Sequence, residues 1–75
     1  MDEEINMGIL IRKRLKKEGR TISWLAGKIN CDSSNIHKIF RKSHLNSFLI
    51  LQISQALDYD FFKHYSAYLV KQNKV

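Results

Sequence analysis

The sequence predicts an all-α domain of five helices. Apolar side chains recur three or four residues apart, as at Ile11 and Leu15 or at Ile50 and Ile53, and this spacing is typical of one helix face. No proline interrupts the 75 residues. No alternation of apolar and polar residues is long enough to favour a strand. The length is that of one small domain, so we expect residues 1–75 to form a single unit without a linker.

Capping residues predict the limits of the first three helices. The first helix is expected over residues 5–18 and to end at Gly19, because glycine suits the left-handed turn after a helix. Thr21 and Asp32 are expected to cap the second and third helices, since their side-chain oxygens can accept hydrogen bonds from free backbone N–H groups. Asn30 suits the turn between them because Asn tolerates positive φ.

A polar connection over residues 41–45 separates these helices from the last two. Asn46 or Ser47 is expected to cap the fourth helix, and Asp60 the fifth. The expected buried faces of the second to fourth helices are formed by Leu25, Ala26, Ile29, Ile36, Ile39, Phe40, Leu49, Ile50, Ile53, Ala56 and Leu57.

Residues 21–41 have the pattern of a helix-turn-helix, in which the second helix enters the DNA major groove. If Ile36 and Ile39 point inward, the polar side chains of that helix remain outside. Asn can pair with adenine, Ser can donate or accept, and Lys can reach guanine. The candidate base-contacting residues are therefore Ser33, Ser34, Asn35, His37 and Lys38. An ordinary solvated helix face is the alternative interpretation.

Basic and polar residues flank this helix on both sides in the sequence. Residues that follow a recognition helix lie beside the phosphate backbone, and those at the start of the preceding helix approach a second stretch of it. The candidate phosphate contacts are Arg20, Thr21, Arg41, Lys42, Ser43 and His44. A solvated run of charge is the alternative. The bases of the first helix fit a solvated face and a general electrostatic contribution equally well.

Composition favours a polyanionic partner. The chain has 13 Lys and Arg against 7 Asp and Glu, a net charge of +6, and a pI near 9.7. The single cysteine, Cys31, cannot form an internal disulfide, which is compatible with a reducing cytoplasm. The acidic N-terminus is unlike a secretory signal, and no apolar run has the length of a membrane span. We therefore expect a cytoplasmic protein without a membrane partner.

Enzymatic chemistry has little support in the sequence. His37, His44 and Cys31 match no zinc-binding spacing, and a fourth ligand is missing. Cys31 lacks a visible activating base, and no pair of carboxylates is arranged for acid–base work. We expect no catalysis, no metal, no cofactor and no small-molecule substrate.

The C-terminal segment has more large apolar side chains than one helix face can bury. They are Phe61, Phe62, Tyr65, Tyr68, Leu69 and Val70. Exposed apolar patches tend to be interfaces, so we expect Phe61, Phe62, Tyr65, Tyr68 and Leu69 to form a homodimer interface. The alternative is that these residues only complete the core.

Residues 8–62 resemble the Cro/C1-type (Xre-like) helix-turn-helix family, most closely its small regulators from Bacteroidetes. The resemblance rests on Ile11, Arg12, Leu15, Thr21, Leu25, Ala26, the run Asp32 to Ile36, Lys38, Ile39, Ile53, Ala56 and Leu57. It implies a bacterial protein with a five-helix, lambda-repressor-like fold, and base contacts at the positions of Ser33, Ser34, Asn35 and His37. Three positions depart from the family: Ile22 replaces a phosphate-contacting Gln, Trp24 replaces Glu, and Asn30 replaces the turn Gly.

The function that the sequence predicts is sequence-specific binding of double-stranded DNA by a transcriptional regulator. We expect a dimer on a two-fold operator, acting as a repressor by occupying a promoter. The alternative is a protein-interaction module of antitoxin or adaptor type, with the same fold and without base readout. RNA binding ranks third, because the chain lacks the aromatic-studded sheet or glycine loop of common RNA modules.

Overall fold

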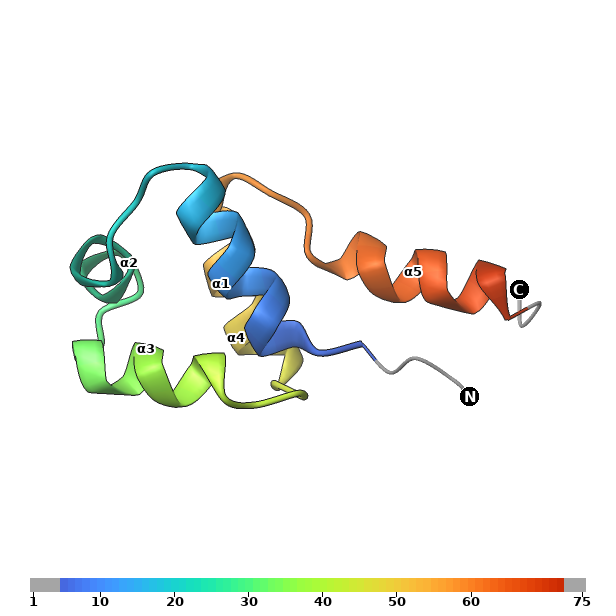
Figure 1. Ribbon diagram of the computed structural model, residues 1–75, viewed down its shortest axis with the longest axis horizontal. Helices are drawn as coiled ribbons and strands as arrows, with labels where there is room; N and C mark the ends of the chain where they lie inside the picture. The colour runs from blue at the N-terminus through green and yellow to red at the C-terminus, as the bar shows by residue number, and fades with distance from the viewer. Residues whose placement is uncertain (1–4, 73–75) are drawn as a thin grey trace.

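The computed structural model describes residues 5–72, and these residues form five α-helices and no strand (Figure 1). The predicted five-helix, all-α fold is confirmed. Helices α1 to α4 pack together, and α5 extends to one side of them (Figure 1). In chain order the helices are α1 (Met7–Lys17), α2 (Ile22–Lys28), α3 (Ser33–Phe40), α4 (Ser47–Leu57) and α5 (Phe62–Lys71).

Side-chain caps begin three of the helices. Thr21 Oγ1 accepts a hydrogen bond from the Trp24 N–H at 3.0 Å, and Asn46 Oδ1 accepts one from the Leu49 N–H at 2.8 Å. The predicted caps of α2 and α4 are therefore confirmed, with Asn46 rather than Ser47 as the cap. Asn6 caps α1 through the Ile9 N–H at 3.1 Å, so α1 begins at Met7 and not at residue 5 as expected.

The two aspartates behave differently from their predicted roles. Asp32 holds the N-cap position of α3, but its side chain makes no capping hydrogen bond. Its backbone carbonyl already accepts from the Asn35 N–H at 2.9 Å, the group that a capping carboxylate would otherwise take. Asp60 lies one residue before the N-cap of α5, Phe61, and its Oδ1 accepts from the Phe62 N–H at 2.9 Å.

Three residues with positive φ turn the chain between helices. Gly19 (φ 69°) follows α1, and Asn30 (φ 62°) lies between α2 and α3, as the sequence predicts. Asp58 (φ 50°) ends α4 in the left-handed region, where Asn and Asp are the most tolerant residues after Gly. The turn after α2 is closed by the Cys31 N–H, which donates to the Ala26 carbonyl at 2.9 Å.

The core is apolar throughout and draws on every helix except α5. Phe40, Leu49 and Ala56, expected in the core, are only half-buried. Phe61, expected at a dimer interface, is 0% exposed and fills the core just before α5 begins, so that expectation is wrong. The buried residues are Met7, Ile11, Leu15, Leu25, Ala26, Ile29, Ile36, Ile39, Ile50, Ile53, Leu57 and Phe61.

Helix α1 is docked closely on the C-terminal end of α3. The Met7 N–H donates to the Ser43 carbonyl at 2.9 Å, and the Gly8 N–H donates to the Lys42 carbonyl at 3.0 Å. A Cβ at Gly8 would lie 2.5 Å from the carbonyl oxygens of Ile39 and Lys42, so only glycine allows this approach. These contacts set the position of α1 beside the candidate recognition helix.

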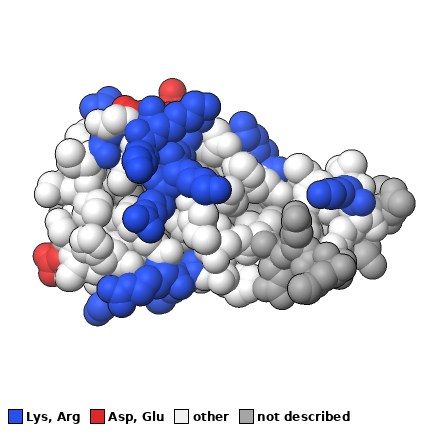
Figure 2. All heavy atoms as spheres, in the orientation of Figure 1, with Lys and Arg blue, Asp and Glu red and all other residues white. Residues whose placement is uncertain are grey.

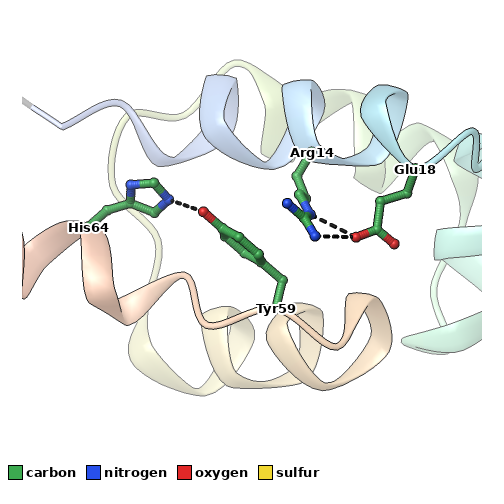
Figure 3. Close-up of polar contacts among 4 residues, drawn as sticks. All are labelled: Arg14, Glu18, Tyr59 and His64. Atoms are coloured by element: carbon green, nitrogen blue, oxygen red, sulfur yellow. Dashed lines mark hydrogen bonds and ion pairs between the residues drawn. The ribbon is translucent and has the colours of Figure 1, made fainter.

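Helix α5 contains no buried residue, and the residues before it connect it to the rest of the domain. The Tyr59 ring packs edge-on against Phe61, with ring centroids 4.7 Å apart. The Arg14 guanidinium of α1 lies 4.1 Å from the Tyr59 ring centroid, and Arg14 also pairs with Glu18 at 2.7 Å (Figure 3). Tyr59 in turn hydrogen-bonds His64 of α5, so one aromatic side chain links α1 to α5.

Candidate nucleic-acid interface

Helix α3 is amphipathic, and its polar face is open to solvent. Ile36 is 0% exposed and Ile39 is 7% exposed, so the two isoleucines determine which side of the helix faces the core. All five predicted base-contacting residues are exposed: Ser33, Ser34, Asn35, His37 and Lys38. Short hydrogen-bonding groups therefore occupy the N-terminal half of the exposed face, which suits contact with base edges in a major groove.

Of the six predicted phosphate contacts, four follow α3 in the chain and two precede α2. Arg41 and Lys42 follow α3 directly and are exposed, as are Thr21 and His44, while Ser43 is half-buried. The Lys42 and Ser43 carbonyls accept hydrogen bonds from α1, so their backbone is held rigidly. Arg20 lies before α2, and its guanidinium is 4.5 Å from the Trp24 ring centroid. This stacking orients a cation beside the start of α2.

Two surface hollows border α3, and each contains residues from a neighbouring helix. The first, of about 190 Å³, is lined by Arg12, Ile22, His37, Phe40 and Arg41. The second, of about 290 Å³, is lined by Ile29, Cys31, Asn35, Lys38, Ile39, Lys42, Leu49 and Gln52. Each hollow thus combines an apolar wall with polar or cationic side chains of α3 and its C-terminal end.

Arg12 and Gln52 are absent from the residues that the sequence predicts for this surface. Arg12 belongs to α1 and Gln52 to α4, so neither lies in the helix-turn-helix segment itself. Gly8, four residues before Arg12, carries a weak signal, since a glycine inside a helix often marks a close approach. For Gln52 the sequence offers no signal, because its position depends on how α4 packs.

The charge on this surface is not neutralised within the described part of the chain. Arg12, Lys38, Arg41 and Lys42 form no ion pair with a carboxylate in residues 5–72. Figure 2 shows Lys and Arg side chains gathered over α1 and along α3, with few acidic atoms among them. Unpaired cations on both sides of a polar helix face create a positive field that attracts phosphate groups.

The thiol of Cys31 lies beside this surface. Its side chain is half-buried at the second hollow. Burial raises the pKa of the Cys31 thiol, and the nearby Asp32 carboxylate raises it further. The reactive thiolate is therefore disfavoured at neutral pH. Within residues 5–72, no group of three His, Cys, Asp or Glu side chains is placed to hold a metal ion.

The apolar side chains of α5 are partly open to solvent. Phe62, Tyr65 and Tyr68 are half-buried, whereas Leu69 is 44% and Val70 62% exposed. With Phe61 in the core, the predicted interface is reduced to Phe62, Tyr65, Tyr68 and Leu69, and Val70 is a further exposed apolar side chain of the same helix. None of the helices in residues 5–72 combines the length and apolar character that crossing a membrane requires.

Comparisons with protein-family models, with curated proteins and with solved structures yield no match to this chain. The resemblance to the Cro/C1-type family therefore stays a prediction.

Proposed function

We propose that the protein is a sequence-specific regulator of transcription that binds double-stranded DNA through α3. The observation that carries this proposal is the division of α3 into two faces. Ile36 and Ile39 anchor one face in the core, while the opposite face exposes Asn35 and its polar neighbours between unpaired cations. Such a helix fits a major groove, because its polar side chains can face the base edges at the floor of the groove and its cations can face the phosphates on either side.

In the proposed mode of action, two copies bind the two halves of a two-fold operator. A single α3 covers only a half-site, so pairing two copies raises the effective concentration of the second helix at the DNA. The exposed apolar side chains of α5 supply the surface for this pairing. Repression follows when the bound dimer occupies a promoter. The expected location is the bacterial cytoplasm, where such an operator is found.

Selection of bound sequences from a pool of random duplexes tests this proposal. The expected result is an enriched motif with two-fold symmetry and half-sites about one DNA turn apart. The affinity for that motif should fall steeply with salt, because each neutralised phosphate releases counterions. Recovery of unenriched sequences, with weak binding to every duplex, would contradict base-specific recognition.

A protein-interaction module is the second candidate, and the surface of α4 favours it. Phe48 is 68% exposed and Leu51, one turn further, is 44% exposed. Large apolar side chains that share a helix face often bind a partner protein. If this function is the correct one, polar substitutions at Phe48 and Leu51 abolish partner binding, and duplex DNA shows no salt-dependent binding.

A further inference from the structure

We propose that Arg12 of α1, together with Arg41, forms a site that binds a phosphate of one strand of the DNA. This inference rests on the proposed function and assigns a binding role to a residue outside the helix-turn-helix. The site is the hollow of about 190 Å³ lined by Arg12, Ile22, His37, Phe40 and Arg41. The position of Arg12 in this site depends on how α1 docks on α3.

The position of Arg12 follows from the docking of Gly8. Backbone hydrogen bonds from the Met7 and Gly8 N–H groups hold the first turn of α1 on the carbonyls of Ser43 and Lys42. Residues four apart in a helix lie on the same face, so Arg12 is stacked one turn beyond Gly8, on the side that meets α3. The contact at Gly8 already holds the backbone of α1 in place. The Arg12 guanidinium therefore lies beside α3 with little further loss of backbone freedom.

The hollow suits an anion supplied from outside the protein, because no carboxylate in residues 5–72 pairs with its arginines. Ile22 and Phe40 provide apolar walls, and His37 packs edge-on against Phe40 with ring centroids 6.4 Å apart. Arg12 and Arg41 make no ion pair with a carboxylate in residues 5–72. Two guanidinium groups that share a hollow repel each other, and a bound phosphate relieves this repulsion while accepting bidentate hydrogen bonds.

The place of the hollow next to α3 identifies this anion as a DNA phosphate. A helix with its side chains is about 10–12 Å wide and fills a major groove about 12 Å wide, so phosphates of the two strands lie along its two sides. Arg12 and Arg41 border one side of α3, and Lys38 and Lys42 line the hollow that contains Asn35. Arg12 and Arg41 therefore bind one strand, and Lys42 lies on the side of the other strand.

Lys13 is a matched control for Arg12. Both are exposed cations of α1, adjacent in the chain. Lys13 instead lines a different hollow, which it shares with His64 and Tyr68 of α5. Replacing either residue by Gln removes one positive charge and retains a polar side chain. The two variants have the same net charge, so any difference between them reports the position of the charge and not its amount.

The experiment measures duplex affinity at several salt concentrations for the parent, Arg12→Gln and Lys13→Gln. The probe is the duplex enriched from the random pool. Arg12→Gln should lower the slope of log affinity against log salt by about one unit, the value for one lost phosphate contact, and Lys13→Gln should leave it near the parent value. Thermal unfolding of both variants verifies that each is folded.

A strand-specific readout completes the test. Replacing single phosphates of the duplex by uncharged methylphosphonates should weaken parent binding at one phosphate per half-site, and at that phosphate the loss should be smaller for Arg12→Gln, which retains only Arg41 in the hollow. Equal salt slopes for Arg12→Gln and Lys13→Gln would overturn the Arg12 site while leaving the proposed function intact. A parent protein that binds no duplex would overturn the proposed function and this inference with it.

Discussion

The hydroxyl of Tyr59 and Nε2 of His64 lie 2.8 Å apart and share a hydrogen bond between the α4–α5 connection and the first turns of α5 (Figure 3). The rings of the two residues are tilted against each other, with centroids 5.8 Å apart. Cations surround this pair, since Arg14 and Lys63 both lie within 4.4 Å of the Tyr59 ring centroid. Burial of the His64 imidazole, together with the nearby Lys63, lowers its pKa and disfavours its protonated form.

The first prediction is a loss of stability at mildly acidic pH. Burial lowers the pKa of His64 below its ordinary value of 6.5, Lys63 acts in the same direction, and Asp60 opposes both. The unfolded chain therefore binds a proton at higher pH than the folded chain, and the free energy of unfolding decreases as the pH falls through about 6.5. Urea unfolding at several pH values measures this. In His64→Gln the decrease should be smaller, and identical pH curves for parent and variant would contradict the assignment.

The second prediction contrasts two glycines. Gly8→Ala should destabilise the protein by roughly 1–3 kcal/mol, because the added methyl group collides with backbone carbonyl oxygens of α3. Gly27 lies within α2, and a Cβ there meets nothing within 4 Å. Gly27→Ala should therefore raise stability by about 0.5–1 kcal/mol through helix propensity. Urea unfolding of both variants tests the close approach of α1 to α3, and similar effects of the two substitutions would argue against it.

The third prediction concerns base recognition. Asn35→Ala and His37→Ala should each weaken binding to the selected duplex by about 1–3 kcal/mol and relax the preference at one base position. Both side chains are exposed, so the melting temperature should change little. Gln55→Ala on α4 is the control, because Gln55 is exposed and lines neither hollow beside α3. Selection repeated with each variant measures the change, and an unaltered motif in both would exclude α3 as the recognition helix.

The fourth prediction is that α5 mediates pairing of two copies. Leu69→Ser combined with Val70→Ser removes the two exposed large apolar side chains of α5, which contribute nothing to the buried core. Sedimentation should show a folded monomer, with much weaker binding to the full operator. Phe48→Ser removes an even more exposed apolar side chain, on α4, and should leave pairing unchanged. A parent that sediments as a monomer and binds a half-site as tightly as a full operator would refute the dimer.

Local features of this fold follow from the sequence because they depend on neighbouring residues. Thr21 caps α2, and Gly19 and Asn30 adopt positive φ where the chain turns. The exposed face of α3 is likewise predictable, since burial of Ile36 and Ile39 decides the orientation of every other side chain on that helix. Asp32 marks the limit of such reasoning, because its own backbone carbonyl already accepts from the Asn35 N–H and its carboxylate makes no capping hydrogen bond.

The sequence by itself determined where the helices lie and which side of α3 faces solvent, because both follow from periodicity and capping within short segments. The tertiary structure alone decided that Phe61 fills the core, that α5 extends away from the other helices, and that Arg12 lies beside Arg41. Each of these depends on contacts between segments distant in the chain. The approach of Gly8 to the carbonyls at the end of α3 is the clearest case, since no local pattern encodes the space that a missing side chain leaves for another helix.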